Sequence, residues 1–529
     1  MAKKPNVILM FIDDLGYGDL SCLNENSRIS TPNIDALGER GVIYTDAHAT
    51  SSLCTPSRYG LLTGRYNWRS HLKSGVLLGT GEPLIEPGRM TMAHAFKQSG
   101  YFTACVGKWH LGMSWHRKPD TDGSEYGIQD EIAAMKAEQA EAKKTGKDVW
   151  RLSNFVDGYD LDYSKPLISG PCDQGFDYFF GMPASLDQPP FVYIENDRVL
   201  VEPDHVSGVF PLDRSGPTMQ ELWQRGPVAT GFDHRQVIPD MQAKVIDLID
   251  SHRDEPFFIY YPTPAVHGPL LPTEEFSGKS GLNLYADMVL QLDCMVGEIM
   301  QKLKETGQWE ETILIFASDN GCSGVADYPF LTANGHNPSY IFRGLKADIY
   351  EGGHRVPSIV SWPGQFKTKK ICDQMVCHSD FFRTLANLIE FQLPENAGED
   401  SIAMPLLNDA SQSGRDTVIH SSGTGEFAIR SKDWKLELCR GSGNYFGGAG
   451  MIEPSTSEEM PYQLYNLADD IGERKNRAAE LPSIVAKLKN ELLAAINLGR
   501  TTPGAPQPNT VHGPWRQLDD IKRHFPWED

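Results

Sequence analysis

Residues 54–65 are the part of this chain whose residue types and order are best suited to chemistry, and they read CTPSRYGLLTGR. Pro56 fixes its own φ and biases Thr55 towards extended backbone, so a helix can open at Ser57. The N-terminus of such a helix favours an anion, and Arg58 lies one turn along, where it can hold the oxygens of a nucleophile. Cys54 is either that nucleophile or a buried thiol before a proline turn, which is what a single cysteine usually is.

Two pairs of oxygen-bearing side chains follow apolar segments. Asp13 and Asp14 come directly after the run 7–12, and Asp319 and Asn320 follow the run 312–316. Carboxylate and amide oxygens at a strand end are good ligands for a hard divalent cation. For either pair alone, a turn or a helix cap is the alternative.

Basic and imidazole side chains follow further apolar runs. Lys108 and His110 come after residues 101–106, His267 comes after residues 256–261, and Lys346 lies in the segment FRGLKAD. A histidine and an ammonium group beside an anion can act as proton donors, since each can be tuned towards neutral pH. Taken singly, such a histidine is more often structural and such a lysine is more often a surface charge.

Together these segments resemble the type I, formylglycine-dependent sulfatases, over about Val7 to Pro357 and in the order of that family. The matching motifs include the stretch 54–65, GKWHLG at 107–112, AVHGP at 265–269 and EGGHRVP at 351–357. No fixed position of the stretch 54–65 departs from the family pattern. Arylsulfatase A and the N-acetylgalactosamine sulfatases are similar members of that family.

The resemblance implies a sulfuric ester hydrolase, with a sulfated galactose or N-acetylgalactosamine unit as the favoured substrate. In that family the cysteine at the position of Cys54 is oxidised by a modifying enzyme to formylglycine. One hydroxyl of its hydrate attacks sulfur, and collapse of the other expels sulfate, so one hard step becomes two. The substrate is expected to be a sulfated glycan or a small sulfate ester.

The resemblance also assigns roles to individual residues. Lys108 would bind sulfate, His110 would take a proton from the hydrate, and His267 with Lys346 would protonate the leaving alcohol. The implied catalytic residues are Cys54, Arg58, Lys108, His110, His267 and Lys346. The implied metal ligands are Asp13, Asp14, Cys54, Asp319 and Asn320. Ca²⁺ is the expected ion and Mg²⁺ the second choice, which agrees with oxygen-rich ligands and no Cys/His cluster in this set.

Other polar residues near these motifs are weaker candidates for substrate binding. Ser185 resembles a family contact to sulfate. Asp187 and Arg343 are candidate glycan contacts or structural ion-pair partners, and the same choice holds for His336 and Asn337.

The elements that would position these side chains alternate between strands and helices. Apolar strands are expected at 7–12, 101–106, 256–261 and 312–316, with helices at 92–98 and 241–252. This order predicts an α/β fold with a parallel sheet, whose carboxyl edge binds ligands. The resemblance implies an alkaline-phosphatase-like fold, in which a large mixed sheet lies between helices.

The pattern of polar and apolar residues changes past about residue 412. Segments 426–430, 434–438 and 462–466 alternate like antiparallel strands, and 481–496 is an amphipathic helix. We therefore expect a catalytic domain over 1–412 and a smaller C-terminal α+β subdomain over 413–529, with an irregular tail from Thr501.

The composition limits the partners. The net charge of −21 excludes a typical nucleic-acid-binding protein and means that a polyanionic substrate must meet a local positive pocket. No apolar run is long enough for a membrane helix. The start of the chain lacks a signal-peptide core, so the chain is either cytoplasmic or without its leader. Export to the periplasm or the outside is favoured, because family members act mostly on external or vesicular substrates.

Two other classes of protein remain as alternatives. A phosphate mono- or diester hydrolase of the same superfamily places Ser or Thr at the nucleophile and often binds two zinc ions. A sulfated-glycan-binding protein without turnover would result if Cys54 were never oxidised.

Overall fold

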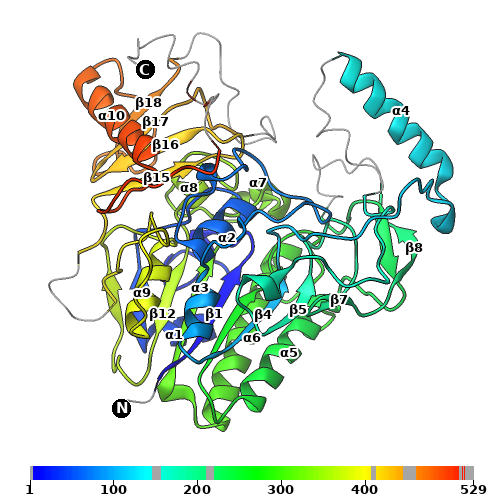
Figure 1. Cartoon of the computed structure of the whole chain (residues 1–529). Coiled ribbons are helices and arrows are strands. Elements are labelled where there is room, and N and C mark those ends of the chain that lie inside the picture. The colour runs from blue at the N-terminus through cyan, green and yellow to red at the C-terminus, as the bar shows by residue number, and fades with distance from the viewer. Residues whose placement is uncertain are drawn as a thin grey trace.

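A ten-stranded mixed sheet forms the centre of the molecule in a computed structural model (Figure 1). The structure describes residues 4–145, 157–209, 220–406, 413–444 and 460–511, with Trp515 and Leu518. In sheet order the strands are β13 (Lys370–Cys372), β2 (Gly41–Tyr44), β12 (Ser358–Ser361), β11 (Thr312–Ser318), β1 (Asn6–Ile12), β10 (Phe257–Pro262), β4 (Phe102–Lys108), β5 (Tyr178–Met182), β6 (Ile194–Glu195) and β7 (Arg198–Val199).

The four strands expected from apolar runs are β1, β4, β10 and β11, and they are neighbours in the sheet. They run parallel in the order β11-β1-β10-β4, with Ile12 paired to Ser318. Strand β1 is buried along its whole length because it is covered on both faces. Ile8, Met10 and Ile12 pack into one hydrophobic core, while the alternate residues pack into a second one. This explains why the strand is apolar throughout rather than alternating.

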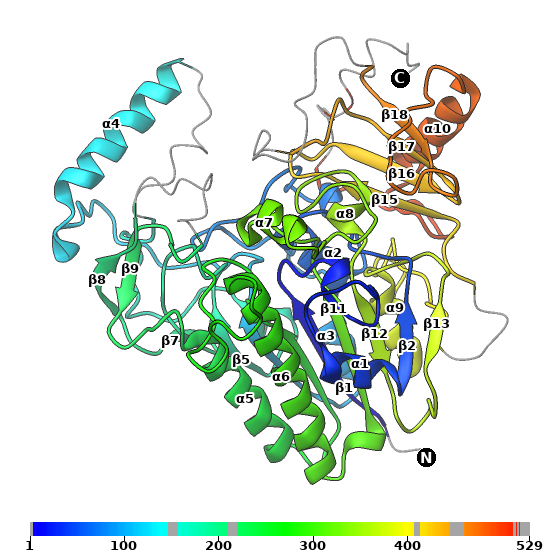
Figure 2. The same cartoon turned by 180° about the vertical axis from the view of Figure 1, so that it is seen from behind.

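Helices cover both faces of the sheet, as expected for an alkaline-phosphatase-like fold. One face carries α1 (Pro32–Gly38), α5 (Val237–Ser251) and α6 (Leu284–Glu305), which Figure 2 shows in front of the strands. The other face carries α2 (Cys54–Thr63), α3 (Met92–Gln98) and α9 (Asp380–Leu388). The helix expected at 92–98 is confirmed, and the one expected at 241–252 begins earlier, at Val237.

The C-terminal region adds a separate antiparallel sheet with α10 (Pro482–Leu498) packed on it. Its strands follow the order β15 (Thr417–Ser421), β16 (Phe427–Ser431), β17 (Trp434–Glu437) and β18 (Gln463–Asn466). The last three correspond to expected strands, whereas β15 was not expected. The predicted boundary after residue 412 falls at 407–412, outside the described residues, so the division into domains stays a prediction.

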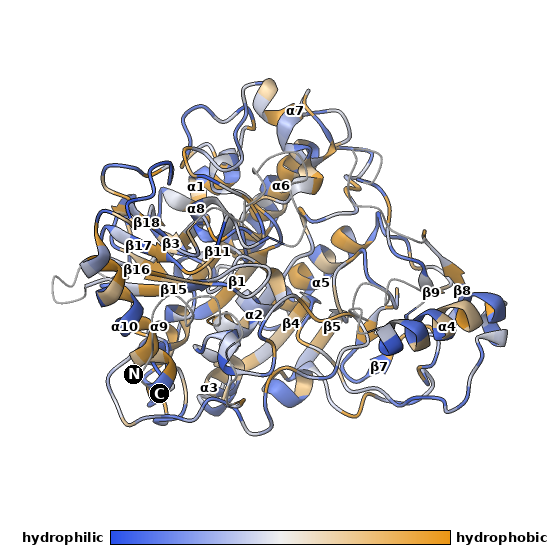
Figure 3. Cartoon of the chain, turned by 90° about the horizontal axis from the view of Figure 1, so that it is seen from above, coloured by the Kyte–Doolittle hydropathy of each residue, from blue (hydrophilic) through white to orange (hydrophobic). Residues whose placement is uncertain are grey.

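Smaller elements surround these two sheets. Helix α4 (Gln129–Thr145) lies away from the central sheet and is largely hydrophilic (Figure 3). The others are β3 (Ala47–His48), β8 (Pro203–Ser207), β9 (Gly226–Ala229), α7 (Tyr328–Ala333), α8 (Glu351–His354) and β14 (Val376–Cys377). Among the described residues, the structure holds no helix with the length and apolar character needed to cross a membrane.

Candidate active site

The carboxyl ends of β1 and β11 bring the two predicted oxygen pairs together. The Asp14 amide donates to Asp319 Oδ1 at 3.2 Å, and the Asn320 side-chain amide donates to Asp14 Oδ1 at 2.7 Å. Asp14 has φ 67°, a left-handed conformation that aspartate tolerates better than most residues. The parallel pairing of Ile12 with Ser318 places the residues after both strands at one edge of the sheet.

This edge offers oxygen ligands that the protein leaves available. Ligand atoms of Asp13, Cys54 and Asp319 lie within 4.8 Å of one another, and all three residues are buried. Among the described residues, neither Asp13 Oδ1 nor Asn320 Oδ1 has a hydrogen-bond partner. Buried polar atoms normally have partners, so these two oxygens fit a bound cation.

Three cationic side chains balance the three carboxylates. Lys108 Nζ lies 2.6 Å from Asp13 Oδ2, and Arg58 Nη2 lies 2.7 Å from Asp319 Oδ2. Lys346 Nζ lies 2.6 Å from Asp14 Oδ1. A divalent ion would therefore make the site positive, as an anionic ester requires despite the negative charge of the whole chain.

The charges shift the pKa values of the buried carboxyls in opposite directions. Burial by itself would raise the pKa of Asp13, but Lys108, His267 and Arg58 together hold it well below its usual value. Burial and the neighbouring Asp13 raise the pKa of Asp319 to about 7. Below that pH, a proton on Asp319 competes with a metal ion.

Cys54 is the first residue of α2 and faces the carboxylates. Burial raises the pKa of its thiol, against the opposing effect of Lys108 and Lys346. The loop before it is fixed by Ser57, whose hydroxyl donates to the Ser51 carbonyl at 2.8 Å. The thiol is therefore not a thiolate at neutral pH, which suits a residue that is converted to another group rather than used directly.

Two histidines border the same site, and each uses a different ring nitrogen to bond a backbone carbonyl. His110 Nε2 lies 2.8 Å from the Leu77 carbonyl, which can only accept, so Nδ1 is the bare nitrogen. Burial, Lys108 and Arg58 lower the pKa of His110 well below its ordinary value, so the ring is neutral. His267 Nδ1 lies 2.6 Å from the Gly268 carbonyl, which leaves Nε2 towards Asp14 Oδ2 at 3.6 Å.

Of the weaker candidates for substrate binding, Ser185 and Asp187 are both buried. Ser185 belongs to the site, since its hydroxyl accepts from Lys108 Nζ at 3.1 Å and lies 3.2 Å from His267 Nδ1. Asp187 is buried, and its carbonyl accepts from the Gln224 amide at 2.9 Å.

Arg343, His336 and Asn337 make contacts that favour structural roles. The Arg343 guanidinium donates to the Glu473 carbonyl at 2.7 Å and stacks over Tyr350. His336 Nε2 lies 2.9 Å from Asp19 Oδ1, and Asn337 Oδ1 accepts from the Tyr328 hydroxyl at 2.5 Å.

Sequence reasoning missed the support that β15 gives to residues 51–53, the loop before the candidate nucleophile Cys54 (the nucleophile loop). The Ser52 amide donates to the Ser421 carbonyl at 3.0 Å, and the Ser421 hydroxyl donates to Ser51 Oγ at 3.0 Å. The Ala347 amide, next to Lys346, donates to the Ser52 carbonyl at 2.8 Å. No local pattern could have revealed these contacts, because the hydrogen-bonded residues are about 300 to 370 positions apart in the chain.

The fold and the site define a hydrolase that binds an anionic ester at an oxygen-rich, cation-lined edge of an α/β sheet. Residues 5–391 match the family model described as Sulfatase, and the chain belongs to the sulfatase family. It is a sulfuric ester hydrolase.

Similar proteins agree with this assignment. The N-acetylgalactosamine-6-O-sulfatase of Bacteroides thetaiotaomicron is 33% identical over 94% of this chain and 93% of its own length. Human arylsulfatase A is 29% identical over 94% of this chain and 90% of its own length. A solved B. thetaiotaomicron sulfatase, described in work on glycosaminoglycan metabolism, has a TM-score of 0.75 at 32% identity and covers 93% of this chain and 99% of that chain.

Proposed function

We propose that this sulfatase removes sulfate from a sulfated carbohydrate of the N-acetylgalactosamine type, using formylglycine made from Cys54. The observation that carries the proposal is the position of Cys54, at the start of α2 and against Asp13 and Asp319. The 33% identical N-acetylgalactosamine-6-O-sulfatase supports the choice of sugar.

We propose that Ca²⁺ occupies the oxygen cluster formed by Asp13, Asp14, Asp319 and Asn320. Two of its oxygens have no hydrogen-bond partner among the described residues, and its donors are carboxylate and amide oxygens, which calcium favours. One imidazole, that of His267, borders the cluster, with a nitrogen within 4.8 Å of oxygens of Asp13 and Asp14. The ion would supply a Lewis acid for a sulfate oxygen and stabilise charge that develops there.

The cations of the site are proposed to bind and orient the sulfate group. Lys108 reaches both Asp13 and Ser185, so its ammonium can turn from these partners to a sulfate oxygen without moving its backbone. Arg58, which is fully buried and held by Asp319, fixes the carboxylate and the start of α2 in place.

Proton transfer is proposed to involve the two histidines at opposite stages. His110 Nδ1 is a bare nitrogen in a neutral ring and suits a proton acceptor from the formylglycine hydroxyl. His267 Nε2 can donate to the leaving alcohol when the ring carries a second proton, because the Nδ1 hydrogen is held by the Gly268 carbonyl. Burial and Lys346 lower the pKa of His267, so its imidazolium form is a strong acid. Lys346 is less suited to give up its proton, because Asp14 raises the pKa of its ammonium despite its burial.

Several wider features follow from the same proposal. Activity requires a formylglycine-generating or other sulfatase-modifying enzyme that acts on Cys54. A glycan substrate places the enzyme in the periplasm or outside the cell. Residues 413–529 form a C-terminal subdomain that supports the catalytic part through Ser421.

Peptide mass spectrometry of the segment around Cys54, followed by sulfate release assays, tests the proposal. We expect the mass of formylglycine and release of sulfate from N-acetylgalactosamine 6-sulfate and from a chromogenic aryl sulfate. Cys54→Ala is the matched control, because it removes the nucleophile, and urea unfolding checks that the variant is folded. A fully converted protein that is inert on every sulfate ester would refute the proposed function.

A further inference from the structure

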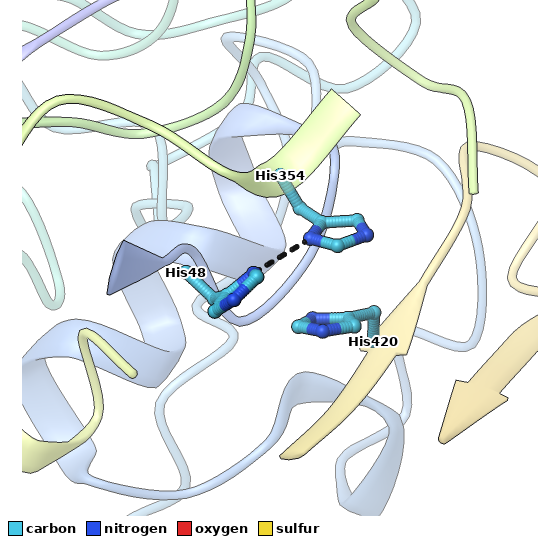
Figure 4. A group of neighbouring side chains, drawn as sticks. All are labelled: His48, His354 and His420. Carbon is cyan, nitrogen blue, oxygen red and sulfur yellow. Dashed lines mark hydrogen bonds between the residues drawn. The ribbon is translucent and has the colours of Figure 1, made fainter. Parts of the chain in front are cut away.

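A second group of potential metal ligands lies outside the active site, where three segments of the chain meet. His48 ends β3, His354 ends α8 and His420 lies in β15, so the group joins the catalytic part to the C-terminal sheet (Figure 4). All three rings are fully buried, and one nitrogen of each lies within 4.8 Å of the others. The proposed sulfatase mechanism uses none of them.

The hydrogen bonds of His48 determine which of its nitrogens is bare. Its Nε2 lies 2.8 Å from Asp46 Oδ1. Arg430 pairs with both oxygens of Asp46, at 2.8 Å each, so this side chain is a carboxylate that can only accept. Nε2 of His48 also lies 3.2 Å from Arg430 Nη1, but its contact with the carboxylate is the shorter one. The hydrogen is therefore assigned to Nε2, and Nδ1 presents a lone pair to Nδ1 of His354 at 3.1 Å.

His354 has two ways to satisfy its nitrogens. Its Nε2 lies 3.1 Å from the Ile349 carbonyl and 3.2 Å from Lys435 Nζ. If Nε2 donates to the carbonyl, two lone pairs face each other across 3.1 Å and need a cation between them. If Nε2 accepts from Lys435, Nδ1–H donates to His48 and no ion is needed for this pair.

His420 lacks a hydrogen-bond partner among the described residues in either arrangement, at both of its nitrogens, and it is 0% exposed. A neutral imidazole always has one N–H group, and leaving it buried without an acceptor is unfavourable. Its ring stacks on His354 with centroids 3.6 Å apart and an interplanar angle of 13°. No group in the described part of the chain satisfies this third ring, whereas an added group can.

We propose that the three imidazoles bind one divalent ion of the zinc type. With Zn–N distances of about 2.0–2.1 Å, two ligands of a tetrahedral ion lie about 3.3 Å apart, close to the observed Nδ1 separation. A carboxylate on one Nε2 and a backbone carbonyl on another are the usual outer partners of zinc-bound histidines. His420 turns out of its stack to direct a nitrogen at the ion, and water completes the coordination.

The surrounding charges permit an added cation. Lys435 and Arg430 lie beside the rings, but both are already paired with carboxylates: Lys435 lies 2.7 Å from Glu473 and 3.2 Å from Glu351. Asp46 and Glu437 add two further acids nearby. Arg355 is a third cation, 3.2 Å from Asp46 and 3.3 Å from Glu351, so four carboxyl groups face three cations. The imidazoles favour zinc over calcium, so this site and the oxygen cluster select different ions. The bound ion would hold β15 against the loop that leads to Cys54.

Metal counting on the full-length protein tests the proposal. Calcium-loaded protein is incubated with zinc, desalted and analysed for bound zinc. His420→Phe keeps a ring against His354 but removes the ligand. His378→Phe is the matched control, since His378 is equally buried, and its nitrogens have no partner among the described residues. We expect wild type and His378→Phe to retain about one zinc ion more than His420→Phe.

The outcomes separate the proposed site from the alternatives. Equal zinc in all three proteins would assign the ion to the active site or the surface and overturn the proposal. X-ray absorption on wild type should show an imidazole-rich shell, and a shell of sulfur or of oxygen alone would also overturn it. If His420→Phe does not fold, the visible spectrum of cobalt-substituted wild type decides, because four-coordinate cobalt absorbs strongly and an absent band refutes the site.

Discussion

His267→Ala should affect substrates according to their leaving groups. The ring is held by the Gly268 carbonyl at 2.6 Å from Nδ1, so Nε2 is the nitrogen that can serve the leaving oxygen. Lys346 cannot replace it easily, because Asp14 at 2.6 Å raises the pKa of the ammonium. General acid catalysis contributes about 10²–10⁴ in rate, or about 2.7–5.4 kcal/mol at about 1.36 kcal/mol per tenfold.

A sugar alkoxide needs the full contribution, whereas nitrophenolate leaves without a proton. We expect kcat/KM for a sulfated sugar to fall by about 10²–10⁴, and kcat/KM for nitrophenyl sulfate to fall by less than about tenfold. The assay compares both substrates on preparations with equal calcium content and equal conversion of Cys54. His252→Ala is the control, since His252 stacks on Phe102 at the opposite end of β4. Equal losses on both substrates would refute the role of His267 as the acid.

Three further predictions concern the metal, the nucleophile loop and the core. Calorimetry should show calcium affinity weakening about fivefold from pH 7 to pH 6, because Asp319, with a pKa of about 7, is increasingly protonated. A flat profile would contradict its role as a ligand. Ser421→Ala removes the hydrogen bond from the Ser421 hydroxyl to Ser51 and should lower kcat with little change in KM, whereas Ser421→Thr keeps the hydroxyl and should have a kcat near that of wild type. A change in KM alone would argue against a role of Ser421 in positioning the loop before Cys54. Arg69→Met leaves the buried Asp400 carboxylate unpaired and should cost about 3–5 kcal/mol of unfolding free energy in urea; a loss under about 1 kcal/mol would show that the pair is not needed.

The clustering of the candidate catalytic residues was predictable because each directly follows an apolar segment or lies within a short motif. Asp13, Lys108, His267 and Asp319 all come at or just after the carboxyl ends of strands that pack as neighbours. The substrate candidates were harder to assign. Arg343 is tied to Glu473 and Tyr350, a contact between distant segments that no local pattern can indicate.

Strand β15 shows the same limit for the fold. Its residues 417–421 pair with β16 on one side only and lie at the edge of the C-terminal sheet. Short edge strands have weak local signals, since their burial comes from the packing of other segments. The histidines at 48, 354 and 420 were equally invisible, because nothing in their local sequences relates them.

The sequence by itself determined the reaction class and the candidate ligands at the strand ends, since these depend on residues that are close in the chain. It predicted a helix that opens at Ser57, whereas α2 begins at Cys54. Only the tertiary structure decided which cation pairs with which carboxylate, and which histidine nitrogen is bare. It also decided that β15 supports the nucleophile loop. The physical reason is that hydrogen bonds and burial depend on distance in space, and sheet order brings together side chains separated by up to 370 residues.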